Sequence, residues 1–346
     1  MKNIAIFFGG CSSEYDVSLA SASSVIRHID RTRFNPVLIG ITRSGCWYRF
    51  TGDISRIETD TWEGSDCTPA HISPNRACQE LLVFQNDKIE HVPLDAALPI
   101  LHGRNGEDGT LQGLLELAGI PVAGCGVLSS ALCMDKDRAH KLASLAGIRV
   151  PNALVVSSGF DWNVVSEKAE KLGYPLFVKP VKAGSSFGVT KVASPKDLRP
   201  AIEEAFRYDN RVIIEEAIWG FEVGCAVMGN TELVTGEIDE IELADGFFDY
   251  TEKYNLVTSK IHVPARIHEN KASELKETAK MIYRALDCRG FARVDMFLTT
   301  EGQIVFNEVN TIPGFTSHSR FPSMMKAAGM GFRDVITKII ELALDI

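Results

Sequence analysis

The fold is decided by the stretch Arg293-Val-Asp295-Met-Phe-Leu-Thr-Thr-Glu-Gly-Gln-Ile-Val-Phe-Asn-Glu308-Val-Asn310. Two alternating apolar runs around a short turn with glycine predict a β-hairpin. Side chains two residues apart share a face of a strand, which puts Asp295 beside Arg293. The same spacing puts Glu308 beside Asn310. If the two faces coincide, hard oxygen ligands of the kind that Mg²⁺ prefers lie together. The alternative is a hairpin with a solvated polar face.

Length and composition bound the class of protein. A chain of 346 residues is too long for one typical core and predicts two or three lobes. The net charge of −9 argues against a nucleic-acid partner, as does the lack of a basic run. Eight cysteines without a C-x-x-C motif indicate reduced thiols in a cytoplasmic protein. No apolar run is long enough to span a membrane, and the short N-terminal strand does not fit a signal peptide.

The first third of the chain opens like a doubly wound α/β unit. A buried strand over Ile4–Phe8 leads into a Gly-Gly turn, and helical periodicity follows over residues 18–29. Val37–Ile41 is the next expected strand. Residues 51–86 are polar, hold two prolines, and predict irregular structure.

A polar loop with three glycines follows the expected strand at residues 98–101. It runs from His102 to Gly109 and precedes a helix expected over residues 110–117. Loops at the carboxyl ends of strands bind ligands in open α/β sheets, which favours a site here. Glu107 and Asp108 fit a simpler role equally well, because carboxylates stabilise the N-terminus of a helix.

A second polar loop lies in the middle of the chain. Residues 174–192 predict a strand, a Gly/Ser loop and a strand, with Lys179 on the first strand and Ser186 in the loop. It is not a Walker P-loop, because neither G-K-[ST] nor a helix follows. Its backbone N–H and hydroxyl groups can still cover phosphates, and Lys179 adds a point charge. An ordinary hairpin is the alternative.

The region after this loop supplies carboxylates and a long irregular segment. A strand pair is expected over residues 212–227, with carboxylates placed to bind adenine and ribose: Glu215, Glu216 and Glu222. Residues 246–261 are aromatic and charged without a clear period, which suits a mobile lid. Further helices are expected over residues 136–145, 162–172, 274–286 and 335–344.

Taken together and in this order, these motifs resemble those of the D-alanine–D-alanine ligases and their relatives of the ATP-grasp fold. The resemblance covers essentially the whole chain. The matching residues are Gly9-Gly10 with Glu14; His102-Gly103-x-x-Gly106-Glu107-Asp108-Gly109; Met134-Asp135-Lys136; Lys179-Pro180 with Gly184-Ser185-Ser186-x-Gly188; Glu222; Lys253-Tyr254; Arg293-x-Asp295; and Glu308-x-Asn310-Thr-x-Pro313-Gly314-x-Thr316-Ser317-His318-Ser319.

The resemblance implies a three-lobed ATP-grasp enzyme with α/β and α+β lobes. A doubly wound N-terminal lobe is expected over residues 1–125, a central lobe over 126–210 and a C-terminal lobe over 211–346. ATP and two Mg²⁺ ions, or Mn²⁺, are the implied cofactors. D-alanine and a second D-amino acid are the implied substrates, joined through a D-alanyl phosphate intermediate. Family members are often homodimers.

The resemblance also assigns roles to single residues. Glu14 is expected to anchor the first D-alanine, and Arg293 with the N–H of Gly314 is expected to stabilise the tetrahedral oxyanion. The expected catalytic residues are Glu14, Ser185, Tyr254, Arg293, Gly314 and Ser319. The expected substrate-binding residues are His102, Lys253, Asp239, Phe248 and Arg320. The expected ATP-binding residues are Lys136, Lys179, Ser186, Glu215, Glu216 and Glu222. The expected metal ligands are Asp295, Glu308 and Asn310.

Departures from the common family pattern point to the second substrate. D-alanine–D-alanine ligases commonly carry Tyr where this chain has Phe248, and Leu where it has Arg320. Relatives that make D-alanyl-D-lactate replace Lys253-Tyr254 with a histidine, and this pair is intact here. With Asp239, these residues resemble the D-alanine–D-serine ligases of vancomycin-resistance clusters, most of all the VanG type.

We therefore expect a ligase that joins D-alanine to D-serine and so modifies a peptidoglycan precursor. A housekeeping D-alanine–D-alanine ligase is the nearest alternative. A different ATP-grasp enzyme such as a carboxylase and a non-catalytic ATP-binding module are the others.

Overall fold

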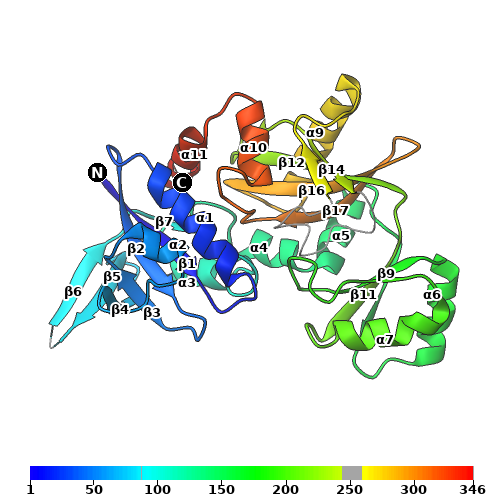
Figure 1. Cartoon of the computed structure of the whole chain (residues 1–346), viewed down its shortest axis with the longest axis horizontal. Coiled ribbons are helices and arrows are strands. Elements are labelled where there is room, and N and C mark those ends of the chain that lie inside the picture. Colours follow the sequence, from blue (N-terminus) through cyan, green and yellow to red (C-terminus); the bar gives the residue numbers. More distant parts are fainter. Residues whose placement is uncertain (87, 244–258, 346) are drawn as a thin grey trace.

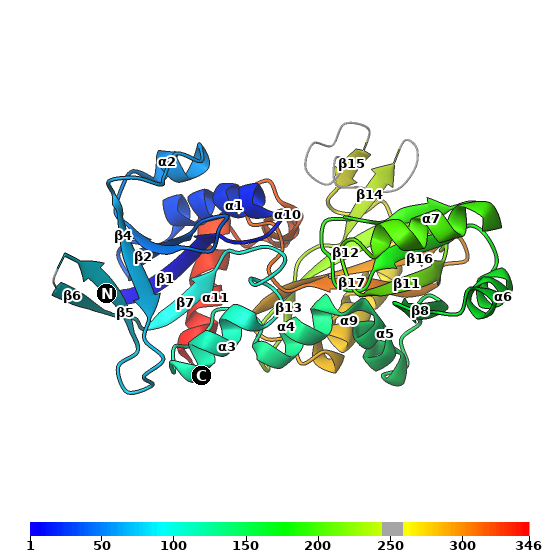
Figure 2. The same ribbon diagram turned by 90° about the horizontal axis from the view of Figure 1, so that it is seen from below.

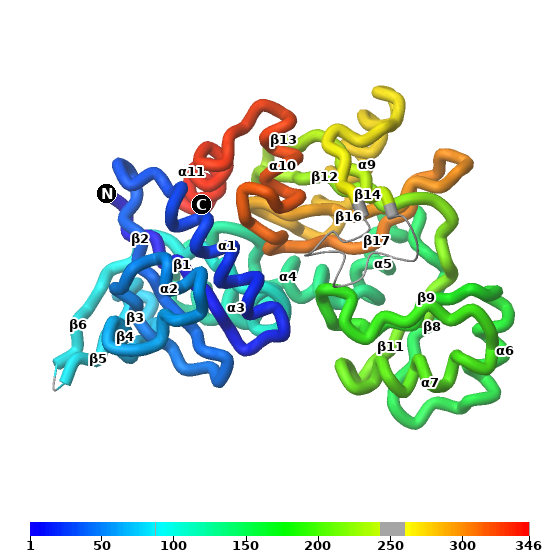
Figure 3. The backbone as a smooth tube through the Cα atoms, in the orientation of Figure 1, coloured from blue at the N-terminus to red at the C-terminus, as the bar shows by residue number. Residues whose placement is uncertain are grey.

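The structure is a computed structural model, and it describes residues 1–86, 88–243 and 259–345. Its described part contains three β-sheets of seven, four and six strands. The seven-stranded sheet lies at one end of the molecule and the other two lie side by side at the opposite end (Figure 1). The backbone trace of Figure 3 shows how the chain leaves the first sheet through helix α4 (Val127–Met134) and returns to it in helix α11 (Phe332–Leu344).

The first sheet confirms the predicted doubly wound unit. Its remaining elements are β1 (Lys2–Gly9), α1 (Tyr15–His28), β2 (Phe34–Ile41), β3 (Trp47–Phe50), α2 (Ile54–Glu58), β4 (Cys67–Ile72), β5 (Glu80–Gln85), β6 (Lys88–Pro93), β7 (Ala96–Pro99) and α3 (Thr110–Leu117). The strand order is β6-β5-β4-β3-β2-β1-β7, and β1 pairs in parallel with β2 and β7. Ile4, Ile6 and Phe8 share a core with α1 and α11. Ala5 and Phe7 belong to a second core, which includes α3, so helices cover both faces.

The expectation of irregular structure over residues 51–86 is wrong. Helix α2 and strands β4 and β5 lie there, and both strands extend the sheet in antiparallel fashion. Ala70 and Ile72 are buried beside exposed neighbours, a short period-two pattern that the prolines concealed. Pro69 is the last residue of β4 paired with β3, and residues 70–72 pair with β5. Its missing N–H therefore falls where the strand changes partner.

The four-stranded sheet carries the Gly/Ser loop between β9 and β10. Its elements are β8 (Ala153–Ser157), α6 (Trp162–Leu172), β9 (Leu176–Pro180), β10 (Thr190–Val192), α7 (Pro195–Ala205) and β11 (Arg211–Glu216). The strands run antiparallel in the order β10-β9-β11-β8. Val165 of α6 and Ile202 of α7 pack on Val178 and Ile214 in one core. The predicted strand–loop–strand unit and the helix over residues 162–172 are confirmed.

The six-stranded sheet faces it. The elements of this part are α5 (Lys136–Leu145), β12 (Gly220–Met228), β13 (Val234–Thr235), β14 (Asp239–Leu243), β15 (Ser259–His262), α9 (Glu269–Ala285), β16 (Phe291–Thr299), β17 (Ile304–Asn310) and α10 (Arg320–Ala327). The path is β15-β14-β12-β16-β17, with β13 beside β12, and β16–β17 is the predicted hairpin. The expected strand pair over residues 212–227 is wrong, because β11 and β12 belong to different sheets. Residues 217–219 carry the chain from one sheet to the other.

The last helix completes the core of the first sheet. Val335, Ile336 and Ile339 of α11 are fully buried in the core that contains β1 and α1. Figure 2 shows α11 beside β7, and the two elements are in contact. Arg33 pairs with Glu341 of α11 at 2.7 Å. Within the described residues no helix combines the length and apolar character that crossing a membrane requires.

Candidate active site

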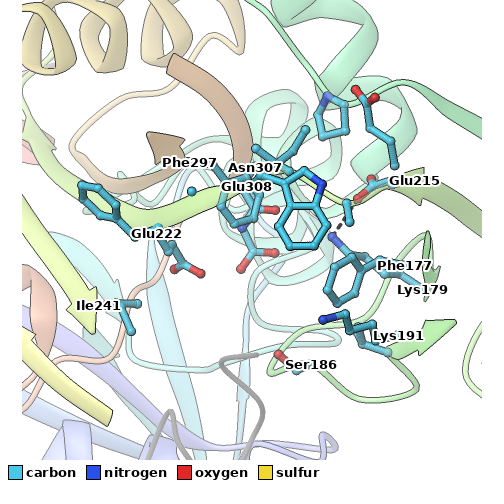
Figure 4. A pocket seen from close by; sticks show the side chains of 18 of the residues that line it. Phe177, Lys179, Ser186, Lys191, Glu215, Glu222, Ile241, Phe297, Asn307 and Glu308 are labelled. Carbon is cyan, nitrogen blue, oxygen red and sulfur yellow. Dashed lines mark hydrogen bonds and ion pairs between the residues drawn. The ribbon is translucent and has the colours of Figure 1, made fainter. Parts of the chain in front are cut away.

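A pocket of about 490 Å³ opens between the four-stranded and six-stranded sheets. Apolar rings line it together with a few convergent charged groups, the usual character of a small-molecule site. The two walls can be followed in Figure 4, where the labelled lining residues are Phe177, Lys179, Ser186, Lys191, Glu215, Glu222, Ile241, Phe297, Asn307 and Glu308.

Lys179 extends from β9 into the pocket and is held by Glu215 of the neighbouring strand. Its Nζ lies 2.7 Å from Glu215 Oε2. Burial lowers the pKa of Lys179, but the surrounding carboxylates, Glu215 foremost, outweigh burial and raise it. Burial raises the pKa of Glu215, and Lys179 more than reverses that effect. The pocket therefore contains a fixed ammonium that keeps its charge, which suits a phosphate ligand.

The other expected ATP-binding residues line the same pocket. Lys136 opens α5, and its Nζ donates to a backbone carbonyl of the Gly/Ser loop at 2.7 Å. The same Nζ lies 3.7 Å from Glu308. Ser186 lines the pocket from the Gly/Ser loop, with a φ of +59°. Glu216 also lines it, while its Oε1 accepts hydrogen bonds from the backbone and side chain of Asn152.

The β16–β17 hairpin brings the expected metal ligands together. Its register places Asp295 opposite Glu308 and Arg293 opposite Asn310. Asp295 is buried and accepts from Arg293 on both oxygens, at 2.8 and 2.7 Å. The Asn310 amide donates to Asp295 Oδ2 at 2.9 Å. Burial lowers the pKa of Arg293, but Asp295 outweighs burial and raises it.

This set of donors fits Mg²⁺ by its chemistry. Two carboxylates and a side-chain amide on paired strands supply hard oxygens, and Mg²⁺ takes its remaining ligands from water and phosphate. Among the described residues no three His, Cys, Asp or Glu side chains gather around a metal position, and the donor set of the hairpin consists of two carboxylates and the Asn310 amide. A bound cation has to compete with Arg293 for Asp295 and with Lys136 for Glu308.

Arg320, the first residue of α10, is buried among three carboxylates. Its Nε and Nη2 donate to Asp239 at 2.7 and 2.8 Å. Its Nη1 donates to Glu222 at 3.0 Å, and its Nη2 lies 3.4 Å from Asp295. The side chain of Arg320 is 7% exposed and that of Asp239 is 0% exposed, so this is not a surface arginine. Burial lowers the pKa of Arg320, but Asp239 and Asp295 hold it well above its ordinary value.

Glu14 and Ser185 connect the first lobe to the Gly/Ser loop. Both side chains are buried, and Ser185 Oγ donates to Glu14 Oε1. Gly103 and Gly184 lie directly against the Glu14 carboxylate, where a Cβ at position 184 would stand 2.7 Å from Oε2. A side chain at either position would clash with this carboxylate, so the two glycines allow the Glu14 side chain to lie against the backbone of both loops.

His102 and Glu107 hold the backbone of Ile312 from the first lobe. His102 Nδ1 donates to the Ile312 carbonyl at 2.8 Å, and Glu107 Oε1 accepts from the Ile312 N–H at 3.0 Å. Burial lowers the pKa of His102, and the carbonyl places its proton on Nδ1. Ser21 Oγ lies 3.1 Å from His102 Nε2 and accepts from the N–H of Phe315 at 3.2 Å. The loop therefore positions the segment that follows β17, a role that the sequence did not reveal for Glu107 or Ser21.

Gly314 and Ser319 lie in this segment, between β17 and α10. Thr316 donates through its backbone N–H to Ser319 Oγ at 3.0 Å. A Cβ at position 314 would stand 3.3 Å from the same hydroxyl. Most of the expected lid, residues 246–261, lies outside the described residues, and so do three of the expected site residues: Phe248, Lys253 and Tyr254.

The fold and pocket define the class. The pocket is large enough for a nucleotide and lies between two antiparallel sheets, with lysines on one wall and the hairpin carboxylates on the other. This is the arrangement of an ATP-grasp ligase. Two family models match the chain: the N-terminus of D-ala D-ala ligase over residues 3–125 and its C-terminus over residues 142–341. The chain belongs to the D-alanine–D-alanine ligase family.

Individual relatives extend over the full chain. The crystal structure of the VanG D-Ala:D-Ser ligase from Enterococcus faecalis is 55% identical, with a TM-score of 0.92 and 99% of both chains covered. A putative D-alanine–D-lactate ligase of Streptomyces coelicolor is 47% identical over 99% of this chain and 97% of its own length. The D-alanine–D-alanine ligase from Bacillus anthracis, solved with ATP, is 29% identical with a TM-score of 0.75 and covers 100% of this chain and 98% of its own.

These findings place the chain among the ATP-dependent ligases that join D-alanine to a second D-amino acid or hydroxy acid in cell-wall synthesis or vancomycin resistance. The alternatives of a carboxylase and of a non-catalytic module are excluded.

We expect the stability of the protein to fall with rising pH because of Glu107. Burial, reinforced by the nearby Glu14 carboxylate, raises the pKa of Glu107 from 4.5 to about 8. The folded protein therefore keeps a proton that the unfolded chain loses. The free energy of unfolding should decline between about pH 5 and pH 8 by up to about 1.4 kcal/mol per pH unit.

Urea unfolding across this pH range measures the slope, and Glu107→Gln should flatten it. Glu116→Gln is the matched control, because Glu116 is exposed on α3. Equal slopes in the wild type and in Glu107→Gln would contradict the raised pKa.

Proposed function

We propose that this enzyme joins D-alanine to D-serine with ATP and Mg²⁺. The observation that carries the proposal is the buried pair of Arg320 and Asp239. D-serine exceeds D-alanine by one hydroxyl, and a subsite that selects this hydroxyl needs fixed polar partners. Arg320 Nη1 carries two hydrogens, of which Glu222 needs one, and Asp239 supplies an acceptor. The 55% identity to the VanG D-Ala:D-Ser ligase supports the proposal.

The first D-alanine is proposed to bind beside Glu14. The carboxylate of Glu14 would take the ammonium, and Ser185 would keep that carboxylate in place through its hydrogen bond. Arg293 and the N–H of Gly314 would stabilise the oxyanion that forms when the second amine attacks. Ser319 would meet the carboxylate of the second substrate, and Lys253-Tyr254 with Phe248 would close the site.

The nucleotide is proposed to occupy the pocket between the two sheets. Lys136 and Lys179 would neutralise phosphate charge, and Ser186 would cover the phosphates from the Gly/Ser loop. Asp295, Glu308 and Asn310 would hold Mg²⁺, which supplies further charge stabilisation during phosphoryl transfer. The remaining carboxylates would bind the adenosine part: Glu215, Glu216 and Glu222.

The product would end a peptidoglycan precursor in D-serine and so confer vancomycin resistance. A cytoplasmic location suits this role, since ATP is made there and all the cysteines of the chain are free thiols.

Competition between D-alanine and D-serine tests the proposal. The wild type should form mainly D-alanyl-D-serine when ATP, Mg²⁺ and both amino acids are supplied together. Arg320→Leu combined with Asp239→Ala removes both charges, so neither remains buried alone. We expect this double variant to lose about 10–100-fold of the D-serine preference, the value of a hydrogen bond to a charged group.

The dipeptide ratio is measured by chromatography of the products. Arg333→Leu is the matched control, because Arg333 is exposed on α11. A wild type that never prefers D-serine, or a double variant with an unchanged ratio, would return the assignment to a D-alanine–D-alanine ligase.

The metal assignment predicts a loss of turnover in Glu308→Gln. The substitution keeps the shape of the side chain and removes its charge, and a metal clamp contributes several kcal/mol to the transition state. We expect kcat to fall by about 10²-fold or more, with a higher Mg²⁺ concentration needed for half-maximal rate. Glu301→Gln, in the exposed turn of the same hairpin, is the control. Near-normal kcat and Mg²⁺ dependence in Glu308→Gln would end the assignment.

A further inference from the structure

Gly224 lies at the centre of the charged cluster around Arg320. It occupies β12 between two other strands, and its register partners are Asp239 of β14 and Asp295 of β16. Directly paired residues of antiparallel strands project to the same face of a sheet. Two carboxylates therefore flank a position that has no side chain. Glu222, two residues earlier on β12, shares this face.

The guanidinium of Arg320 fills the space that a side chain at position 224 would take. A Cβ built there would stand 2.5 Å from Arg320 Nη2, 2.7 Å from Asp239 Oδ1 and 3.0 Å from Asp295 Oδ1. These atoms cannot move aside at low cost, because ion pairs hold each of them. Asp239 binds Arg320 at 2.7 Å, and Arg293 binds Asp295 at 2.7 Å.

We propose that Gly224 is a specificity-determining position of the second-substrate site, because its bare strand surface seats Arg320 between Asp239 and Asp295. The inference rests on the proposed function, in which Arg320 and Asp239 recognise the hydroxyl of D-serine. A methyl group at this position displaces the guanidinium from the sheet and separates it from the carboxylates. The subsite then loses the fixed donors and acceptor that distinguish D-serine from D-alanine.

Gly224 differs from an ordinary strand glycine in the atoms that surround it. Gly220 of the same strand lies against the backbone of Leu298, where a larger residue would distort the sheet itself. The near neighbours of Gly224 are the charged ends of side chains instead. Its φ is not in the positive range, so alanine suits the backbone conformation at this position. Replacement therefore acts through the charged cluster.

The test compares four proteins under competition between D-alanine and D-serine. They are the wild type, Gly224→Ala, the double variant Arg320→Leu/Asp239→Ala, and this double variant with Gly224→Ala added. In the wild-type background we expect the added methyl to raise KM for D-serine and lower the D-alanyl-D-serine to D-alanyl-D-alanine ratio by about 10-fold or more. KM for the first D-alanine should stay near its wild-type value. In the double variant the two closest groups are gone and only Asp295 Oδ1, at 3.0 Å, remains, so the methyl should change KM and the ratio much less than in the wild-type background.

Gly126→Ala is the matched control, because no atom lies within 4 Å of a Cβ at that position. A dipeptide ratio in Gly224→Ala equal to that of the wild type overturns the inference. The inference also fails if the methyl changes KM for D-serine and the dipeptide ratio equally in the wild-type and double-variant backgrounds. If Gly224→Ala does not fold, the inference is tested by thermal unfolding of the double variant with and without the added Gly224→Ala substitution. A double variant that folds with the methyl supports the inference, and one that also fails to fold with the methyl overturns it. If the wild type prefers D-alanine, the proposed function fails, and Gly224 is judged by KM of the second D-alanine in the same four proteins.

Discussion

The carboxylate of Asp295 is the contact on which the rest of the site depends. It binds Arg293 with both oxygens, accepts from the Asn310 amide, and faces Arg320 at 3.4 Å. Each of these charges would be costly to bury alone, and together they compensate one another. Removing one partner of a buried ion pair typically costs about 3–5 kcal/mol, because the other is left uncompensated. Arg293, Asn310 and Arg320, for which three different roles are proposed, therefore cannot change independently of Asp295.

A second constraint joins the first lobe to this cluster. The carbonyl and N–H of Ile312 are both bound by side chains of the His102 loop, so the peptide after β17 is held from the first lobe. The contact between Ser185 and Glu14 ties the Gly/Ser loop to the same lobe. Gly314 lies two residues beyond Ile312, and its backbone is thus positioned by residues more than two hundred positions away in the sequence. The candidate site therefore combines residues positioned by all three sheets.

Features that depend on local sequence could be predicted, and features that depend on tertiary register could not. The β16–β17 hairpin could be predicted because apolar and polar residues alternate on both sides of one turn. The same period of two indicates which side chains share a face of the hairpin. The same alternation made residues 212–227 look like one hairpin, since nothing local shows that the chain changes sheets at residues 217–219. Arg320 and Asp239 were expected as substrate-binding residues from the family resemblance, and the structure shows that they pair. Gly224 gave no signal, because an absent side chain has meaning only when the residues packed above it are known. The roles of the site residues and the lobe boundaries stay predictions.

The proposed function would explain the charged cluster around Arg320 by substrate selectivity rather than by stability. Replacing a buried ion pair by apolar side chains of similar volume is often neutral or stabilising by about 1–4 kcal/mol, so such a pair is weak evidence of a stabilising role. A subsite with unpaired polar groups rejects D-alanine because those groups stay unsatisfied when the substrate hydroxyl is missing. Arg320 also donates to Glu222, which lines the nucleotide pocket. One planar guanidinium thus joins a residue that lines this pocket to Asp239, the acceptor proposed for the hydroxyl of D-serine.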